Sequence, residues 1–425
     1  MGIQSMNTET YNIAFIDPTV SPTYLVEKLH QYNVRVIGIF TLEEKDYLYY
    51  YPEVFDEVIQ LKGITDTQVL TDLLRKLNAD YFFYGSEATV LFADKLINLI
   101  SPAFANDMAT SMYRYDKFDM QEAMKKAHLP YVKQIRVNAS LSDAQKAEMK
   151  TFDFPVIIKP IEGSGSRGLK ICHSLEAVQE FLDSSCHPRE GGDPSEIDSR
   201  LRGNDISYVI QEFLVGDEYL IDAVSLAGEH RVVSLQRYEK IIYNGYPIYR
   251  YAEILEAGND FWKQCSDFAL KVLDAVGLKN GFSHIEFFLT KKGFFLVEVN
   301  PRISGALGFM NKLAENALGS SQPACLMDMI LKKPDVPPSK LLQEGRIVVL
   351  QNWHPKKIKN MNMDLLKTLS SYSDHVMLKS EGTFQDSPKN LLDSVAYVLL
   401  LNKNKDQLVA DYNTLMEWEK DSALF

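Results

Sequence analysis

The chain has 425 residues, which is too long for one ordinary core, so two or three compact units are expected. A hydrophobic fraction of 46% and a charged fraction of 24% are typical of globular proteins and exclude bulk disorder. The formal net charge of -12 excludes a general nucleic-acid binder, because neutralising a phosphate backbone requires a surplus of Lys and Arg.

The cysteines and the apolar residues indicate a cellular compartment. Cys172, Cys186, Cys265 and Cys325 are scattered, so we expect neither a zinc site nor a disulfide framework. The chain contains no apolar run long enough to span a bilayer, and its first residues lack the basic and apolar regions of an export signal. We therefore expect a cytoplasmic protein with no membrane association.

Residues 1–105 predict an open α/β layer. Strands are expected at 12–17, 34–40, 57–61 and 81–84, with helices around 24–29, at 66–77 and from about residue 86 onward. This alternation favours a parallel sheet. Gly85, Ser86 and Glu87 follow the last strand, so a ligand could bind there, at the carboxyl end of the sheet; alternatively, Ser86 only caps the next helix.

Residues 106–335 are predicted to form a larger second domain. An amphipathic helix is expected at 116–128, followed mainly by strands and one glycine-rich loop as far as Ile221. A long helix at 256–276 and a hairpin with strands 283–289 and 294–299 come next. A small subdomain is expected at about 152–215, and its segment 184–206 has the aperiodic, turn-rich character of an inserted surface loop.

The Pro-rich stretch from Lys333 to Pro338 is predicted to be a linker. Beyond it, residues 340–425 predict a C-terminal α/β cap that ends in a helix at 405–418.

A phosphate site is suggested by a lysine beside a glycine-rich turn. The apolar strand 154–160 delivers Lys159 just before the segment from Glu162 to Gly168. Glycines let backbone N–H groups approach phosphate oxygens, and serine hydroxyls add donors. The spacing differs from a Walker loop, and the same pattern also suits a flexible hairpin. The residues of interest in this loop are Ser164, Gly165, Ser166 and Gly168.

A nucleotide could also be bound between residues 208 and 222, where one strand leads through a Gly turn into another. Backbone groups between such strands can read the edge of adenine, and Glu218 can accept hydrogen bonds from ribose hydroxyls. The alternative is an ordinary hairpin.

The strongest signal is a pair of glutamates in the hairpin at 283–299. Period-two alternation predicts one face that carries Glu286, Phe288, Leu296 and Glu298. Like charges across a strand ladder repel, so a cation is expected, and carboxylate oxygens suit magnesium. Asn300 adds a neutral oxygen, and Arg302 supplies a planar fork for a carboxylate or a phosphoryl group in transfer. The alternative is a solvated hairpin with two exposed glutamates.

Taken in order, these motifs resemble ATP-grasp enzymes, and most closely the L-amino acid ligases that join two amino acids into a dipeptide. The resemblance covers most of the chain and lies in the order of an α/β domain, an Asp-Lys helix, a Lys-Pro strand with its Gly loop, a Gln-Glu-Phe-Leu hinge and a Glu-Val-Asn-Pro-Arg motif. It implies an α/β ATP-grasp fold with an N-terminal open α/β domain, a two-lobed α+β ATP-binding domain and a C-terminal α/β cap. It also implies activation of a carboxylate as an acylphosphate, which an amine then attacks.

The resemblance assigns roles to matching residues. Lys117 and Lys159 would hold the ATP phosphates beneath the loop 164–168, Glu218 would bind ribose, and Arg302 would stabilise the intermediate. The adenine would contact Gln211, Glu212, Phe213 and Leu214. The metal ligands would be Glu286, Glu298 and Asn300, holding Mg²⁺ or alternatively Mn²⁺. Relatives are often homodimers, so a homodimer is possible here too.

Two departures from the family pattern affect these assignments. Many relatives have Glu where this chain has Gln211, although an amide oxygen can still accept a hydrogen bond from the adenine amino group. Ile303, Ser304 and Gly305 stand where related ligases often carry a Gly pair, so the substrate loop is not defined. The tyrosine-rich segment 237–251 either contacts substrate or is an ordinary packed strand pair.

Two other functions are compatible with the same motifs. One is a carboxylase-type ATP-grasp enzyme that activates bicarbonate; Ala123 to Lys126 superficially resembles a biotin site but lies in a predicted helix. The other is a non-catalytic nucleotide-binding module. The intact set of Glu286, Glu298, Asn300 and Arg302 favours an enzyme.

Overall fold

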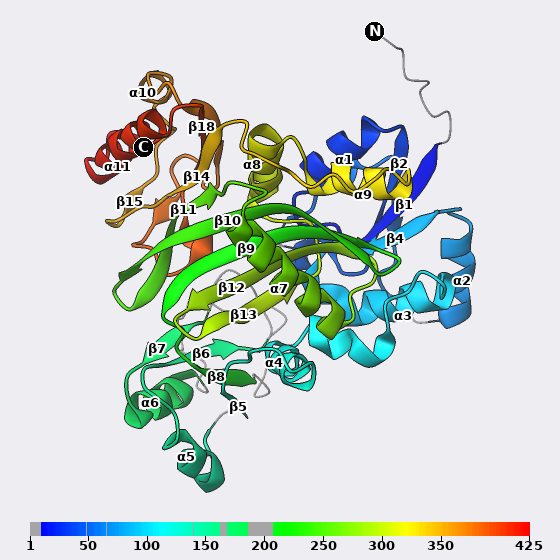
Figure 1. Ribbon diagram of the computed structural model, residues 1–425, viewed down its shortest axis with the longest axis horizontal. Helices are drawn as coiled ribbons and strands as arrows, with labels where there is room; N and C mark the ends of the chain where they lie inside the picture. Colours follow the sequence, from blue (N-terminus) through cyan, green and yellow to red (C-terminus); the bar gives the residue numbers. More distant parts are fainter. Residues whose placement is uncertain (1–9, 48, 65, 139, 162–167, 186–206) are drawn as a thin grey trace.

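The computed structural model describes residues 10–47, 49–64, 66–138, 140–161, 168–185 and 207–425 (Figure 1). These residues form a four-stranded parallel sheet, a four-stranded antiparallel sheet, an eight-stranded antiparallel sheet and a two-stranded pair. No helix in the described ranges combines the length and the apolar character needed to cross a bilayer.

The N-terminal sheet is parallel and open, which confirms the prediction for this region. Its order is β3-β2-β1-β4, so the direction of strand addition reverses between β1 and β4. The strands are β1 (Tyr11–Ile16), β2 (Val34–Phe40), β3 (Glu57–Gln60) and β4 (Tyr81–Tyr84). The helices are α1 (Pro22–His30), α2 (Thr67–Arg75) and α3 (Val90–Ile100), with short 3-10 helices η1 (Glu44–Asp46), η2 (Pro52–Val54), η3 (Glu87–Thr89) and η4 (Met108–Arg114).

The small antiparallel sheet, at the bottom of Figure 1, has the order β5-β8-β6-β7. It comprises β5 (Gln134–Val137), β6 (Val156–Pro160), β7 (Lys170–Cys172) and β8 (Tyr208–Glu212). Helix α4 (Lys117–Lys126) precedes it, with the Asp116 carboxylate as N-cap.

Helices α5 (Asp143–Met149) and α6 (Leu175–Ser185) also lie in this part of the chain, where mainly strands were predicted. That prediction missed two local signals. A Ser142–Gln145 capping box begins α5, and α6 buries Val178 and Leu182, four residues apart.

The eight-stranded sheet forms the centre of the molecule, in the order β13-β12-β9-β10-β11-β14-β18-β16 (Figure 1). Its first five strands along the chain are β9 (Gly216–Leu226), β10 (Glu229–Tyr243), β11 (Tyr246–Ile254), β12 (Gly281–Thr290) and β13 (Gly293–Asn300). Helix α7 (Asp260–Val276) packs on one face, where the Phe268 and Phe287 ring centroids are 5.5 Å apart. Side chains alternate along a strand, so Glu286, next to Phe287, lies on the opposite face.

Helix α7 begins four residues later than the predicted 256–276, because Asn259 caps it by accepting a hydrogen bond from the backbone N–H of Trp262 at 2.8 Å. The chain then continues after β13 through η6 (Ala306–Gly308), α8 (Phe309–Leu318) and α9 (Gln322–Ile330).

The longer C-terminal strands do not form a sheet of their own. β14 (Glu344–Leu350) pairs with β11, and β18 (Ala396–Asn402) and β16 (Tyr372–Met377) extend the same sheet. Helix α11 (Lys405–Lys420) packs against β14 and β18. The smaller elements are β15 (Lys356–Lys357), α10 (Met363–Leu366), β17 (Phe384–Gln385) and η7 (Leu391–Asp393).

Candidate functional site

The predicted metal ligands lie on the hairpin of β12 and β13, where Glu286 and Glu298 are direct cross-strand partners. A bulge follows: Phe287 pairs with Leu296, and Val297 has no partner in the ladder. The prediction that Leu296 shares a face with the two glutamates is therefore wrong. Leu296 joins the fully buried Phe287 in the core, whereas the carboxylates face the other way.

Two lysines from other elements reach these carboxylates. Lys117, the first residue of α4, places its ammonium Nζ 3.2 Å from Oε2 of Glu298. Lys159, on β6 of the small sheet, is buried and interacts electrostatically with Glu298, Glu286 and Lys117. The structure thus brings together residues that are up to 181 positions apart in the sequence.

The environment of Glu298 and Lys159 changes the pKa of both side chains. Burial raises the pKa of Glu298, but Lys117, Lys159 and a hydrogen bond from Asn300 outweigh it, so the pKa lies well below its usual range. Burial lowers the pKa of Lys159 to about 8 despite the opposing effect of Glu298. Asn300 Nδ2 donates to Glu298 Oε1 at 3.2 Å. Glu298 is therefore ionised at neutral pH.

Sequence reasoning missed a buried histidine beside Glu286. His284 places Nε2 3.3 Å from Glu286 Oε1 and Nδ1 2.8 Å from Asp222 Oδ1. Burial lowers the pKa of His284, but these two carboxylates outweigh burial and raise it to about 9. Ser234 Oγ donates to the other Asp222 oxygen at 3.1 Å. Period-two alternation was a usable signal, because His284 precedes Glu286 by two residues and shares its face.

The predicted adenine segment connects two sheets and is not an ordinary hairpin. Gln211 and Glu212 end β8 in the small sheet, whereas Glu218 lies in β9 of the large sheet. Between them, the Phe213 N–H donates to the carbonyl of Pro155 at 3.3 Å, and Leu214 continues the connection. Gln211 Nε2 donates to Gln134 Oε1 at 3.0 Å, which leaves its amide oxygen as the acceptor that the adenine assignment needs.

Glu218 has a cation partner that was not predicted. The ammonium of Lys240, on β10, lies 2.8 Å from Oε1 and 2.7 Å from Oε2 of Glu218. The same ammonium lies 4.1 Å from the ring centroid of Tyr249. A carboxylate offers about four lone-pair sites, so Glu218 can still accept hydrogen bonds from a ribose. Lys240 and Tyr249 both belong to the tyrosine-rich segment 237–251.

Arg302 is hydrogen-bonded both to Glu87 of the N-terminal unit and to neighbouring residues of its own segment. Its Nε donates to Glu87 Oε2 at 2.8 Å, its Nη1 donates to the carbonyl of Ile303 at 3.1 Å, and its backbone N–H donates to the carbonyl of Asn300 at 2.9 Å. Burial raises the pKa of Glu87, but the Arg302 guanidinium outweighs it and keeps the pKa below its usual value. Ser86, next to Glu87, caps η3 by accepting from the Ala88 N–H at 3.2 Å, as predicted, whereas a ligand at Gly85 to Glu87 stays a prediction.

The segment after Arg302 is fixed by buried polar contacts. Ser304 N–H donates to Gln322 Oε1 at 2.8 Å, and Ser21 Oγ donates to the Ser304 carbonyl at 2.8 Å. Ala306 and Leu307 have φ angles of 55° and 51°, a left-handed conformation that is strained without glycine. The segment that departs from the family's Gly pair is therefore hydrogen-bonded to the first residues of α9 and to the N-cap of α1.

The structure describes only part of the predicted phosphate loop. Ser164, Gly165 and Ser166 lie outside the described residues, as does most of the segment 184–206. Gly168 is described; its φ of 65° is left-handed, and a Cβ there would lie 3.0 Å from Cγ of Pro160.

The oxygen donors of the hairpin are of the kind that binds a hard divalent cation. Glu286 and Glu298 supply carboxylates and Asn300 supplies an amide, which are ligands that Mg²⁺ accepts. Among the described residues, no group of three or more His, Cys, Asp or Glu side chains is arranged to hold a metal ion. A cation at this position therefore needs further oxygens, such as those of phosphate groups or water.

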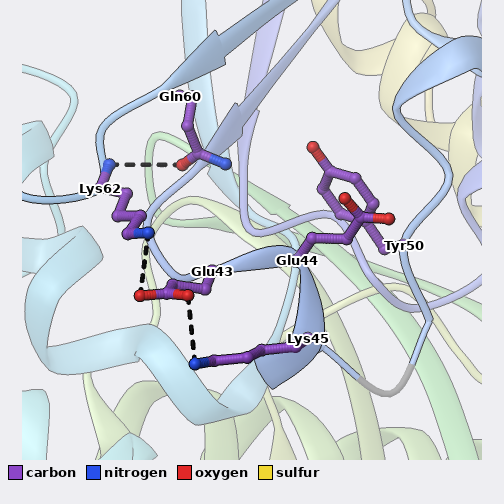
Figure 2. A pocket seen from close by; sticks show the side chains of 6 residues that line it. All are labelled: Glu43, Glu44, Lys45, Tyr50, Gln60 and Lys62. Atoms are coloured by element: carbon purple, nitrogen blue, oxygen red, sulfur yellow. Dashed lines mark hydrogen bonds and ion pairs between the residues drawn. The ribbon is translucent and has the colours of Figure 1, made fainter.

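A separate surface pocket of about 490 Å³ lies in the N-terminal unit (Figure 2). Lys62 and Lys45 both pair there with the carboxylate of Glu43, at 2.8 and 3.3 Å. None of the residues predicted for the ATP site lines it. Its cations and carboxylates neutralise one another in exposed positions, where ion pairs contribute little.

Comparisons with known proteins show what the chain is similar to. Residues 152–309 match a family model described as an ATP-grasp domain. Dapdiamide A synthase from Enterobacter agglomerans is 30% identical over 265 residues, covering 62% of this chain and 58% of that protein. An L-arginine-specific L-amino acid ligase from Bacillus subtilis is 23% identical over 293 residues, 67% of each chain. The chain thus aligns with about three fifths to two thirds of these relatives' lengths.

Among solved structures, an L-amino acid ligase from Bacillus licheniformis superposes with a TM-score of 0.74 at 13% identity. The superposition covers 97% of this chain and 98% of that chain. This likeness shows the fold over nearly the whole chain.

Proposed function

Since the chain belongs to the ATP-grasp superfamily, we propose that it is an ADP-forming ligase that activates a carboxylate as an acylphosphate and joins it to an amine. Its substrates are two amino acids, and its product is a dipeptide or a similar amide. The substrate class rests on the relatives, because one of them is named as an L-amino acid ligase.

One observation carries the proposal: two facing carboxylates with three cationic side chains converging from separate elements. Glu286 faces Glu298, Lys117 pairs with Glu298, and Lys159 approaches from the small sheet. Arg302 follows two residues after Asn300. Carboxylates can bind a divalent cation, and the cationic side chains can bind the oxygens of a polyphosphate. This arrangement suits phosphoryl transfer, because that reaction depends mainly on positioning and charge compensation.

Each residue then has a definite task. Glu286, Glu298 and Asn300 would hold Mg²⁺, or alternatively Mn²⁺, and this cation would supply positive charge that reduces the repulsion between ATP and the incoming carboxylate. Lys117 and Lys159 bind phosphate oxygens, together with the loop 164–168. Gln211 to Leu214 bind adenine and Glu218 binds ribose. Arg302 offsets the charge of the transferring phosphoryl group and of the acylphosphate. No covalent bond to the enzyme is required.

The test is an assay of phosphate release with ATP, Mg²⁺ and a panel of amino-acid pairs, with mass spectrometry of the product. We expect ADP, phosphate and an amide in equal amounts, and loss of turnover when EDTA removes the metal. Turnover only with bicarbonate would support the carboxylase-type alternative. ATP binding without turnover under any condition would support a non-catalytic module.

Two variants test the assigned residues. Glu298→Ala and Arg302→Ala should each lower ADP formation by on the order of a hundredfold to a thousandfold, because each removes a positioned charge at the reacting group. Circular dichroism should show that both variants still fold. Near-normal turnover of either one would contradict the assignment.

We further propose that the protein forms a homodimer. Sedimentation equilibrium would decide it, since a monomer of 48.4 kDa and its dimer differ twofold in mass.

A further inference from the structure

Gln211, which we propose for adenine, lies on the same face of the small sheet as Lys159. In the ladder between β6 and β8, Ile157 pairs with Gln211. Two residues further along β6, Lys159 pairs with Val209. Alternate residues of a strand share a face, so these side chains all point to one side of the sheet. Ile158, on the opposite face, belongs to a buried hydrophobic cluster.

A chain of three hydrogen bonds sets the orientation of the Gln211 amide. Nε2 of Gln134, on β5, donates to the main-chain carbonyl of Phe118 at 2.8 Å and to Oε1 of Glu122 at 3.3 Å, both on α4. A carbonyl can only accept, so the NH₂ group of Gln134 must face α4 and its oxygen must face away. That oxygen accepts from Nε2 of Gln211 at 3.0 Å, and the two glutamines are direct partners in the β5–β8 ladder.

This hydrogen-bond chain leaves the oxygen of the Gln211 amide for a ligand. Nε2 of Gln211 is directed at Gln134, and none of the residues that the structure describes donates a hydrogen bond to Oε1 of Gln211. An amide has one accepting and one donating side, so its orientation decides which group a base meets. A glutamate at position 211 would need no orienting partner, because both oxygens of a carboxylate accept.

We propose that Gln134 is a positioning residue that holds the Gln211 oxygen toward the base and so selects a 6-aminopurine nucleotide over a 6-oxopurine nucleotide. This inference rests on the proposed function, in which Gln211 contacts adenine. The amino group at C6 of adenine donates to the oxygen, whereas a carbonyl at C6 would set two acceptors against each other. Gln211 is 4% exposed, so water does not compensate for an unpaired acceptor there.

The experiment compares the affinity of one protein for two nucleotides and requires no turnover. Isothermal titration calorimetry with Mg²⁺ measures Kd for ADP and for inosine diphosphate, which differ only at C6 and the adjoining N1. We expect wild-type protein to bind ADP about tenfold or more tightly than inosine diphosphate, because the latter leaves buried acceptors unpaired. The preference is a ratio of two Kd values, so a smaller folded fraction in a variant does not change it.

Two substitutions of Gln134 have different expected results. Gln134→Leu removes the acceptor, so the Gln211 amide can turn, and the preference for ADP should fall to about threefold or less. Gln134→Lys replaces the acceptor with a donor, for which Glu122 remains a partner. The Gln211 oxygen should then turn toward the introduced ammonium and its NH₂ group toward the base, so inosine diphosphate should bind more tightly than ADP. A merely structural role of Gln134 would not invert the preference.

Two controls separate amide orientation from other effects. In the double variant Gln134→Leu, Gln211→Glu, either carboxylate oxygen can accept from adenine, so the preference for ADP should return to about tenfold or more. Gln68→Lys repeats the lysine substitution at an exposed glutamine of α2, outside the small sheet, and should keep the wild-type ratio.

Three results would overturn the inference. The first is equal wild-type affinity for the two nucleotides, and the second is an unchanged ratio in both Gln134→Leu and Gln134→Lys. The third is a loss of preference that persists in the double variant, which would mean that Gln134 does not act through the amide of Gln211.

Failure of the proposed function gives a different outcome. If wild-type protein binds neither nucleotide, the proposed function fails and this inference fails with it. If the nucleotide preferences follow the expected pattern but no acid and amine are joined, the ligase function fails while this inference holds.

Discussion

The acidic side chains of the site each have a cationic neighbour before any ligand binds. Glu298 pairs with Lys117, Glu218 with Lys240, Glu87 with Arg302, and Glu286 lies beside His284. Repulsion between facing glutamates was the reason for expecting a cation from sequence. Lys117 and His284 already relieve part of that repulsion, so the metal proposal rests on the oxygen donor set and on the family, and less on repulsion.

Lys240 allows a test at the scale of one residue. Lys240→Met should destabilise the protein by on the order of 3 kcal/mol, because Glu218 is 8% exposed and would lose its buried cation partner. The free energy of unfolding is obtained from urea titration. The double variant Lys240→Met, Glu218→Gln is the control and should regain most of the loss, since it leaves no uncompensated charge. A single variant as stable as wild type would show that the pair is too solvated to matter.

At the scale of elements, irregular backbone sets the direction of the functional side chains. The bulge at Val297 lets β13 send Leu296 into the core and Glu298 toward the site. The close approach of Gly85 to Pro18 directs the chain from β4 toward Glu87. Both features lie within two residues of a side chain that contacts the site.

Gly85→Ala tests the second of these features. The added Cβ would lie 2.3 Å from Cα and 2.5 Å from N of Pro18, so the backbone must move. We expect a loss of about 1–3 kcal/mol in stability, as for other overpacked sites, and a lower kcat because Glu87 and Arg302 shift. Thermal unfolding and the phosphate-release assay measure the two effects.

Gly305→Ala is the stability control for this variant, because a Cβ there meets nothing within 4 Å. Its melting temperature should match that of wild type. A Gly85→Ala protein with an unchanged melting temperature would show that the turn adapts freely.

At the scale of the whole molecule, one hydrophobic cluster connects the sequence-defined units, beside smaller clusters within them. A single hydrophobic cluster includes Ala14 of the N-terminal sheet, Ile221 and Phe287 of the large sheet, and Ile347 and Leu399 of its C-terminal strands. Arg114 adds a polar connection: its guanidinium binds Asp94 of α3 at 2.7 Å and the carbonyl of Val276, at the end of α7, at 2.8 Å. We therefore expect the units to unfold together.

Arg114→Met tests this coupling. Arg114 is 1% exposed, so its loss leaves Asp94 as a buried carboxylate without a cation and should cost about 3–5 kcal/mol. Scanning calorimetry should show a lower melting temperature and an earlier transition for the N-terminal unit. Lys95→Met, an exposed neighbour of Asp94 on α3, is the control and should unfold like wild type. One unshifted transition in Arg114→Met would argue against the coupling.

Much of the fold was predictable because its signals are local. Apolar runs and helical spacing predicted the parallel N-terminal sheet, and the turn at 290–293 predicted the hairpin of β12 and β13. Helices α5 and α6 were missed, although Ser142 and Val178 carried local signals for them. The alternation of Leu296 with Glu298 failed because a bulge depends on how the partner strand packs, which no single-strand pattern reveals.

By itself, the sequence determined the order of the motifs and supplied the residues that we propose for phosphoryl transfer: Lys117, Lys159, Glu286, Glu298, Asn300 and Arg302. Only the tertiary structure decided which of them meet and what else meets them. Lys240 reaches Glu218 from the neighbouring strand, His284 links Asp222 to Glu286, and Glu87 reaches Arg302 across 215 positions. The reason is physical, because the energy of a charge pair depends on the distance between the two charges in space. Strand order, register and the packing of the sheets set that distance. The spacing of residues along the chain does not encode it.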